Sequence, residues 1–203
     1  VPDDAVESRK ITDVELCFVL SNKPGVRALE RARTHGIKPI VVDMKSYADR
    51  AEFEKVLIET IDAEAPDLIV LAGMMIMMPV ELVRKYHNRI INVHPALIPS
   101  FCGKGFYGIR PHEAVLKSGV KVTGATVHFV DEGMDSGPII LQEAVPVEDD
   151  DTVATLADRI LHLEHRLYVR AVRLYCEGRI HIAGRAVKIL PPRQNPKEEG
   201  ERH

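Results

Sequence analysis

Short, almost continuous runs of valine, isoleucine and leucine recur along the chain, and segments with helical spacing separate them. Strands that are apolar on both faces must be buried on both faces, which is typical of parallel sheets covered by helices. The pattern therefore predicts an α/β fold with a doubly wound, mostly parallel sheet. In the first half, after a helix end at residues 4–10, the expected strands are residues 14–20, 39–42, 67–73 and 89–93, and the expected helices are residues 26–34, 51–63 and 80–86.

The second half of the chain changes character, because its elements are longer. Residues 122–130 and 139–147 are two longer strands, and residues 131–138 separate them. A long helix is expected over residues 152–177, with acidic residues at its start and Gly178 at its end. Its apolar residues recur at steps of three and four, so one face should pack against the core.

Length and composition place further bounds on the protein. A chain of 203 residues fits a single core, and we expect one domain over residues 1–190 with a polar tail over residues 191–203. The net charge of −3 argues against a surface for nucleic acid, and no apolar run is long enough to span a membrane. Cys17, Cys102 and Cys176 are too widely spaced for a disulfide framework, which favours a reducing cytoplasm.

Two segments carry residues suited to chemistry. Asn92 and His94 lie two residues apart at the end of a strand, so their side chains point to the same side. In open α/β sheets, ligands bind at that edge. These two residues alone fit a loop histidine beside a capping asparagine better than a catalytic pair. A second strand, however, also ends in a loop, and that loop carries Asp131, Glu132 and Asp135.

Several motifs in combination resemble the folate-dependent formyltransferases, and the resemblance extends over residues 4–190. The motifs are Ser21-Asn-Lys, Leu71-Ala-Gly73, Asn92-Val-His-Pro95, residues 124–138 and Leu163-Glu-His-Arg-Leu-Tyr168. The resemblance implies a Rossmann-like formyltransferase fold. It also implies that the chain transfers the formyl group of 10-formyltetrahydrofolate, its co-substrate, to the amino group of 5-phosphoribosylglycinamide in purine (IMP) biosynthesis, without a metal.

By this resemblance, three residues would perform the chemistry. Asn92 would hydrogen-bond the formyl oxygen, His94 would act as general acid, and Asp135 would hold His94 and favour its protonated form. Attack by an amine on a formyl carbon builds a tetrahedral adduct with a developing oxyanion. A donor fixed at that oxygen contributes roughly 3–4 kcal/mol in comparable sites. A histidine that titrates near neutrality can relay the proton from the attacking nitrogen to N10 of the folate.

The resemblance also implies two binding sets. The residues expected to hold 10-formyltetrahydrofolate are Arg50, Met75, Ile76, Met77, Met78, Asn92, Asp131, Glu132, Gly133, Met134 and Asp135. The residues expected to hold the amine substrate are Leu161, His162, Leu163 and Glu164. The expected partners are these small molecules, without nucleic acid or membrane, and a homodimer is one assembly that the sequence leaves open.

Other conspicuous residues have more than one interpretation. His162-Leu-Glu-His165 has neither of the histidine spacings typical of zinc sites on helices, so we do not expect a metal there. The methionines of residues 74–78 suit core packing and could also line the slot of a flat ligand. The glycine-rich residues 103–108 are expected to form a mobile lid rather than a phosphate loop. His128, inside a strand, fits a core histidine and a catalytic one equally well.

Two departures from the family pattern leave other functions open. In the family, a first strand and a Gly-Ser-Asn loop grip the substrate phosphate, whereas residues 4–8 align with the end of the following helix. We therefore expect that strand and loop upstream of Val1. Val169 replaces a usual proline. The alternatives are a 10-formyltetrahydrofolate deformylase and a non-catalytic folate- or nucleotide-binding module. Formylation of methionyl-tRNA is disfavoured because neither a second domain nor a basic surface follows Leu190.

Overall fold

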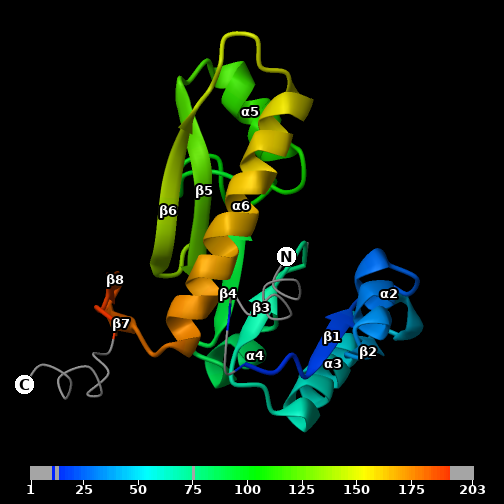
Figure 1. Ribbon diagram of the computed structural model, residues 1–203. Coiled ribbons are helices and arrows are strands. Elements are labelled where there is room, and N and C mark those ends of the chain that lie inside the picture. The colour runs from blue at the N-terminus through cyan, green and yellow to red at the C-terminus, as the bar shows by residue number, and fades with distance from the viewer. Residues whose placement is uncertain (1–10, 12–13, 75, 193–203) are drawn as a thin grey trace, which may run out of the picture.

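The strands of the protein form three sheets in a computed structural model that describes residue 11, residues 14–74 and residues 76–192 (Figure 1). A parallel pair consists of β1 (Phe18–Ser21) and β2 (Lys38–Val41). The central sheet has the order β3 (Ile69–Leu71), β4 (Ile90–His94), β5 (Val122–Phe129) and β6 (Ile139–Pro146). A C-terminal hairpin consists of β7 (Ile180–Ala183) and β8 (Ala186–Ile189).

The direction of the strands changes midway along the chain. The pairs β1–β2 and β3–β4 are parallel, as the apolar runs of the first half predict. The pairs β4–β5 and β5–β6 are antiparallel, so the central sheet is mixed. A short loop joins β5 to β6, and a short loop permits only antiparallel pairing. The expectation of longer strands in the second half is confirmed, because β5 and β6 have eight residues each.

Helices flank the strands and mostly match the helical spacing of the sequence. They are α2 (Arg27–Thr34), the 3-10 turn η1 (Met44–Ser46), α3 (Arg50–Glu64), α4 (Val80–Lys85), α5 (Arg110–Ser118) and α6 (Val153–Cys176). The longest, α6, begins at a capping box formed by Thr152 and Thr155. In the described part of the chain, no helix combines the length and the hydropathy that crossing a bilayer requires.

Two hydrophobic cores lie on opposite sides of β4. Ile91 faces a core that β5 and the apolar face of α6 complete with Phe129 and Leu167. Ile90, the preceding residue, faces the other core, which contains Phe53 of α3 and Leu82 of α4. Successive side chains of a strand point to opposite faces, so both isoleucines are fully buried and each serves a different core. The strand β4 is therefore covered on both faces, as predicted, whereas Gln142, Ala144 and Pro146 of β6 are exposed.

Several elements differ from the sequence-based expectations. The strand expected from residue 14 begins at Phe18, and β3 is only three residues long, because the chain turns away before Gly73, which has a φ of +68°. Helix α5 and the β7–β8 hairpin were not predicted. The expected helix end at residues 4–10 and most of the polar tail lie outside the described residues, so the division of the chain at residue 190 stays a prediction.

Each sheet ends in unpaired strand edges within the described part of the chain, and those of β1 and β3 are two of them. Neither the edge of β1 away from β2 nor the edge of β3 away from β4 has a strand partner there. Backbone groups at such edges need other hydrogen-bond partners. A further strand, as the family resemblance implies, would meet unpaired edges, and its existence stays a prediction.

Candidate active site

The polar residues at the end of β4 face a second polar pair on β5. Asn92 lies directly opposite His128, and His94 lies directly opposite Thr126. Side chains opposite each other on neighbouring strands share one face of the sheet. The alternation that places Asn92 and His94 on one side therefore also brings His128 and Thr126 to that side.

Asp135 reaches this face from the loop that follows β5. Its Oδ2 lies 3.6 Å from Nδ1 of His94 and accepts a 2.9 Å hydrogen bond from the backbone N–H of Gly103. Its Oδ1 lies 3.7 Å from Nε2 of His128. The structure thus brings the three residues predicted to be catalytic into one cluster, which also includes His128. We call Asn92, His94, His128 and Asp135 the β4–β5 cluster.

The proton positions on His94 follow from its neighbours. Its Nε2 lies 2.9 Å from the backbone oxygen of Phe101. A carbonyl oxygen can only accept, so Nε2 carries a proton and donates it. A second proton, on Nδ1, would face the Asp135 carboxylate, and the two would then form an ion pair. With only 4% of its surface exposed, His94 is shielded from bulk water on both sides.

By the same argument, His128 is the other tautomer, with its proton on Nδ1. Its Nδ1 donates to the backbone oxygen of Phe129 at 2.8 Å, which leaves Nε2 as the acceptor in the neutral ring. Burial lowers the pKa of His128, although this backbone hydrogen bond and Asp135 oppose the shift. Nε2 of His128 lies 3.4 Å from Nδ2 of Asn92, so the neutral ring orients the Asn92 amide. In the sequence, Thr126 and His128 lie two residues apart on one strand, as Asn92 and His94 do, and this spacing could have indicated that both face the same side.

Buried side chains fix the segment that leaves β4 after His94. Thr126 donates through its hydroxyl to the oxygen of Ala96 at 2.7 Å and accepts from the N–H of Ile98 at 3.2 Å. The Gln142 amide donates to the Thr126 hydroxyl at 2.9 Å and to the oxygen of Ile98 at 3.0 Å. This network holds the exit of β4 against β5 and β6.

Tyr168 of α6 fixes the two parallel strands from the other side. Its fully buried hydroxyl lies 2.5 Å from the oxygen of Leu71 and 2.9 Å from the oxygen of Ile91, the residue before Asn92. Burial raises the pKa of Tyr168 well above its usual value, so the hydroxyl keeps its proton and can donate. The ends of β3 and β4 are therefore held to α6 beside the cluster.

The loop of residues 131–137 is held by its own side chains and by a helix. Oδ1 of Asp131 accepts from the N–H of Gly133 at 3.1 Å and from the hydroxyl of Ser136 at 2.6 Å. Glu132 forms a two-point ion pair with Arg84 of α4, with N–O distances of 2.8 and 3.0 Å. Met134 is 40% exposed. The predicted folate-binding residues of this loop thus surround Asp135 in an ordered turn.

The remaining residues predicted to bind the folate divide into two groups. Arg50, Met77 and Met78 line an open cavity of about 650 Å³ between α3 and residues 77–81. None of the residues that line this cavity belongs to the β4–β5 cluster. Ile76 packs against the core that contains Met78, whereas Met77 is 44% exposed, so the methionine run combines core and surface positions. Met75 lies outside the described residues.

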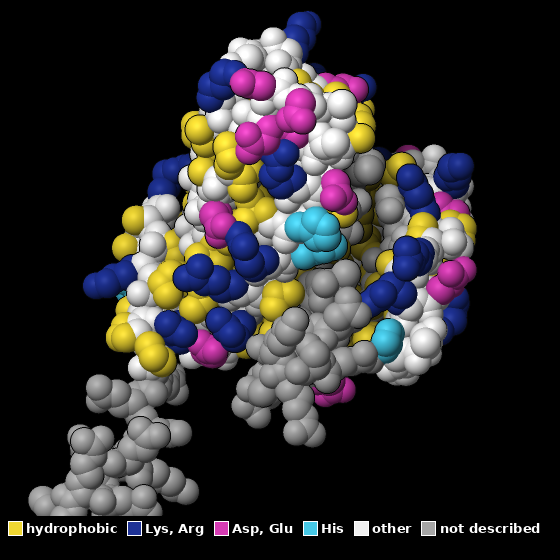
Figure 2. All heavy atoms as spheres, turned by 45° about the horizontal axis from the view of Figure 1, so that its top comes forward, with side chains coloured by type: hydrophobic (Ala, Val, Ile, Leu, Met, Phe, Trp, Pro, Cys, Tyr) yellow, Lys and Arg dark blue, Asp and Glu magenta, His cyan; other side chains and the backbone are white. Residues whose placement is uncertain are grey.

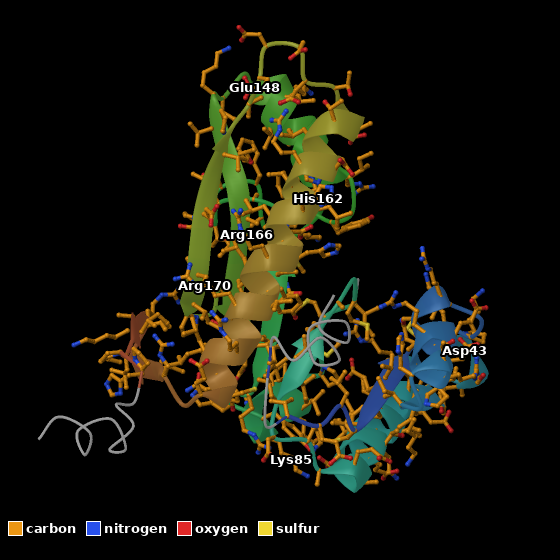
Figure 3. All side chains as sticks on the ribbon, viewed as in Figure 1. Asp43, Lys85, Glu148, His162, Arg166 and Arg170 are labelled. Carbon is orange, nitrogen blue, oxygen red and sulfur yellow. The ribbon has the colours of Figure 1, made fainter. Side chains whose placement is uncertain are left out.

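The predicted amine-binding segment lies on α6. Leu161 and His162 are exposed, Leu163 is buried, and Glu164 is half-buried (Figure 3). Burial raises the pKa of Glu164 to about 7. Within the described residues, no hydrogen bond or ion pair joins this segment to the β4–β5 cluster, and no three His, Cys, Asp or Glu side chains gather as a metal site requires.

The segment expected to form a lid begins against the cluster. Phe101 accepts from His94 and Gly103 donates to Asp135, so residues 101–103 touch both. The ring of Phe106 meets that of Phe101 edge-on, at 6.4 Å between centroids. Cys102 lies between Phe101 and Gly103, and burial and the Asp135 carboxylate raise the pKa of its thiol. Whether residues 103–108 move stays a prediction.

The fold and the cluster define an α/β protein in which a histidine, an asparagine and a carboxylate meet in one largely buried cluster. The model of the Formyl transferase family matches residues 4–172. A chloroplastic phosphoribosylglycinamide formyltransferase from Arabidopsis thaliana is 41% identical over 91% of this chain and 63% of its own length. The chain belongs to the formyl transferase family.

Solved structures agree with this assignment. Glycinamide ribonucleotide transformylase 1 from Symbiobacterium toebii has a TM-score of 0.85 and 42% identity, covering 93% of this chain and 86% of that protein. A formyltetrahydrofolate deformylase from Pseudomonas syringae has a TM-score of 0.83 and 26% identity, covering 93% of this chain and 60% of that protein. The α/β fold predicted from the sequence is therefore confirmed, and the chain spans 63% of the length of its plant relative.

Proposed function

We propose that this chain transfers the formyl group of 10-formyltetrahydrofolate to the amino group of 5-phosphoribosylglycinamide, a step of purine synthesis. The observation that carries the proposal is the meeting of Asn92, His94 and Asp135 in one buried cluster of a formyl transferase family member. The names of the relatives at 41% and 42% identity support the choice of substrates.

The cluster suits each step of the transfer. The amine nitrogen attacks the formyl carbon, and negative charge develops on the formyl oxygen. The Nδ2 hydrogen of Asn92 that does not face His128 can stabilise this oxyanion, an effect of roughly 3–4 kcal/mol in comparable sites. As the bond between N10 and the formyl carbon breaks, the attacking nitrogen loses one proton and N10 gains one. His94 relays that proton, and Asp135 stabilises the imidazolium.

The cavity between α3 and residues 77–81 suits part of the folate. Its volume of about 650 Å³ lies within the range of small-molecule sites. Met77 and Met78 offer apolar, polarisable walls, and Arg50 offers a cation for the carboxylates of the folate's glutamate end. We propose that the flat ring system lies toward residues 131–135 and the glutamate end toward Arg50.

Release of His94 is part of the proposed cycle. In the described conformation, one ring nitrogen faces Asp135 and the other donates to the oxygen of Phe101, so neither is available to a substrate. We infer that residues 101–108 move away from His94 when the substrates bind. This motion is the lid function that the glycine-rich sequence suggests.

A single assay separates this function from its alternatives. The purified chain is incubated with 10-formyltetrahydrofolate, and tetrahydrofolate formation is followed with and without glycinamide ribonucleotide. The proposal requires product only when the amine is present. Product without the amine would indicate a deformylase, which the similarity to the Pseudomonas syringae structure makes the second candidate. Folate binding without turnover under both conditions would indicate a binding module.

Variants test the assigned roles. His94→Ala and Asp135→Asn should each lower kcat by orders of magnitude while folate binding persists, and Asn92→Ala should lower kcat by about 10²–10³-fold. His87→Ala is the matched control, because His87 is an exposed histidine just before β4, and it should keep normal turnover. Near-normal kcat in either of the first two variants would refute the acid and its partner.

We further propose a cytoplasmic location. Cys17, Cys102 and Cys176 are all free thiols, and this usage suits a reducing compartment. Cell fractionation tests the location. Light scattering of the purified protein decides between a monomer and a homodimer.

A further inference from the structure

The backbone of Asp135 adopts a conformation that needs support from its surroundings. Its φ is +53°, in the left-handed region that residues with a side chain seldom adopt. Nevertheless, this backbone must hold the carboxylate between His94, His128 and the N–H of Gly103. Contacts to the backbone of the residues next to Asp135 therefore bear on the geometry of the cluster.

The C-terminal hairpin supplies such a contact. Arg185 donates through a guanidinium nitrogen to the backbone oxygen of Ser136 at 2.6 Å. Ser136 follows Asp135 directly, so the guanidinium holds the peptide unit between Ser136 and Gly137, one residue beyond Asp135. Figure 1 shows the hairpin beside the end of the β5–β6 pair at which the 131–137 loop lies.

Hydrogen bonds and apolar packing hold the β7–β8 hairpin that carries this arginine. Arg185 stands at the turn between β7 and β8, next to Gly184, which has a φ of +60°. At the open end of the hairpin, the backbone N–H of Leu190 donates to the oxygen of Arg179 at 2.8 Å, and the Arg179 side chain donates to the oxygen of Leu190 at 2.8 Å. Apolar side chains of both strands, Ile182 and Val187 among them, pack against the larger core.

Arg185 and Arg166 make different kinds of contact. Lys and Arg side chains are frequent on the face that carries the C-terminal half of α6 (Figure 2), where Figure 3 labels Arg166 and Arg170. Arg166 pairs with the Glu143 carboxylate, which is a surface ion pair. Arg185 instead reaches a backbone carbonyl of the loop that carries Asp135.

We propose that Arg185 is a positioning residue, which holds the Ser136 carbonyl so that Asp135 stays aligned with His94 and His128. The proposal rests on the proposed function only where it concerns turnover. Arg185 touches no reacting atom and acts through Asp135. Because the contact is solvent-exposed, it contributes little to global stability, and its effect should appear in the geometry of the cluster.

The first test does not depend on any activity. Long-range ¹H–¹⁵N spectra of the imidazole rings report the protonation and hydrogen bonding of each ring nitrogen. Arg185→Ala should shift the ring signals of His94 and His128 and leave the denaturation midpoint nearly unchanged. The matched control is Lys188→Ala, which removes an exposed cation from the same hairpin and should shift neither signal. Unchanged His94 and His128 signals in Arg185→Ala would overturn the proposal.

The second test uses turnover, once the wild-type chain is shown to formylate. Loss of one hydrogen bond of about 1 kcal/mol corresponds to a kcat about fivefold lower in Arg185→Ala, with KM little changed. Arg185→Lys should restore part of this loss. In an Asp135→Asn background, Arg185→Ala should have almost no further effect, because the two residues act as a unit. Independent, multiplicative losses would show that Arg185 does not act through Asp135.

Discussion

Replacing Glu164 by glutamine should stabilise the protein at pH 8 and leave its stability almost unchanged at pH 4. Glu164 is half-buried on α6, and no group in the described part of the chain donates a hydrogen bond to its carboxylate or pairs with it. Burial therefore raises the pKa of Glu164 from 4.5 to about 7. Glutamine keeps the shape of the protonated acid but cannot ionise.

The magnitude and the sign follow from proton linkage. Below the unfolded pKa of 4.5, the acid is protonated in both states and ionisation has no effect. Between that pH and about 7, the unfolded chain ionises and the folded chain does not, so the wild-type stability falls by ~1.4 kcal/mol for each pH unit. Above pH 7, the loss is complete and amounts to about 3 kcal/mol. Glu164→Gln should escape this loss.

Urea denaturation followed by circular dichroism measures this difference. The free energy of unfolding of wild type and Glu164→Gln is compared at pH 4, 5, 6, 7 and 8. Glu113→Gln serves as the control, because Glu113 is an exposed carboxylate on α5, and its substitution should have a small effect at every pH. A difference between Glu164→Gln and wild type that stays flat from pH 5 to pH 8 would refute the reasoning, as would a difference of the opposite sign.

Two further substitutions test the supports of the site. Tyr168→Phe should lower the free energy of unfolding by about 1–3 kcal/mol, because it removes a buried hydroxyl that donates to the oxygens of Leu71 and Ile91. Chemical denaturation measures the loss, and a change below about 0.5 kcal/mol would contradict it. Gly137→Ala should cost about 3 kcal/mol, because a Cβ there would lie 1.9 Å from the backbone oxygen of Phe129; a thermal midpoint equal to that of wild type would show that the loop adapts.

The parts of the site that depend on local alternation could be predicted from the sequence. Asn92 and His94 share a face because strand side chains alternate, and their position at the end of an apolar run led to the prediction of a site there. Strand pairing, by contrast, depends on register. That Asn92 lies opposite His128 follows only when β4 and β5 are aligned, and for this reason the role of His128 stayed open.

Some other features were missed although the sequence carried a local signal for them. Others have no local signal at all. Helix α5 has Pro111 in its first turn and Gly119 at its end, and both are boundary signals that the sequence displayed. The contact between Arg185 and Ser136 joins residues 49 positions apart in the sequence, and nothing in either segment points to the other. Such contacts are set by the packing of whole elements, so periodicity and motif cannot supply them.

The position of β4 between two cores has a consequence for how the protein opens. Ile90 belongs to one core and Ile91 to the other, and the catalytic candidates Asn92 and His94 follow directly. Local unfolding of the elements around either core would therefore loosen β4, which carries Asn92 and His94. The geometry of the β4–β5 cluster should then be lost whenever either core opens. Backbone amides of β4 should then exchange with solvent at least as fast as those around the core that opens more readily, and a proteolytic nick near either core should abolish turnover before the rest of the chain unfolds.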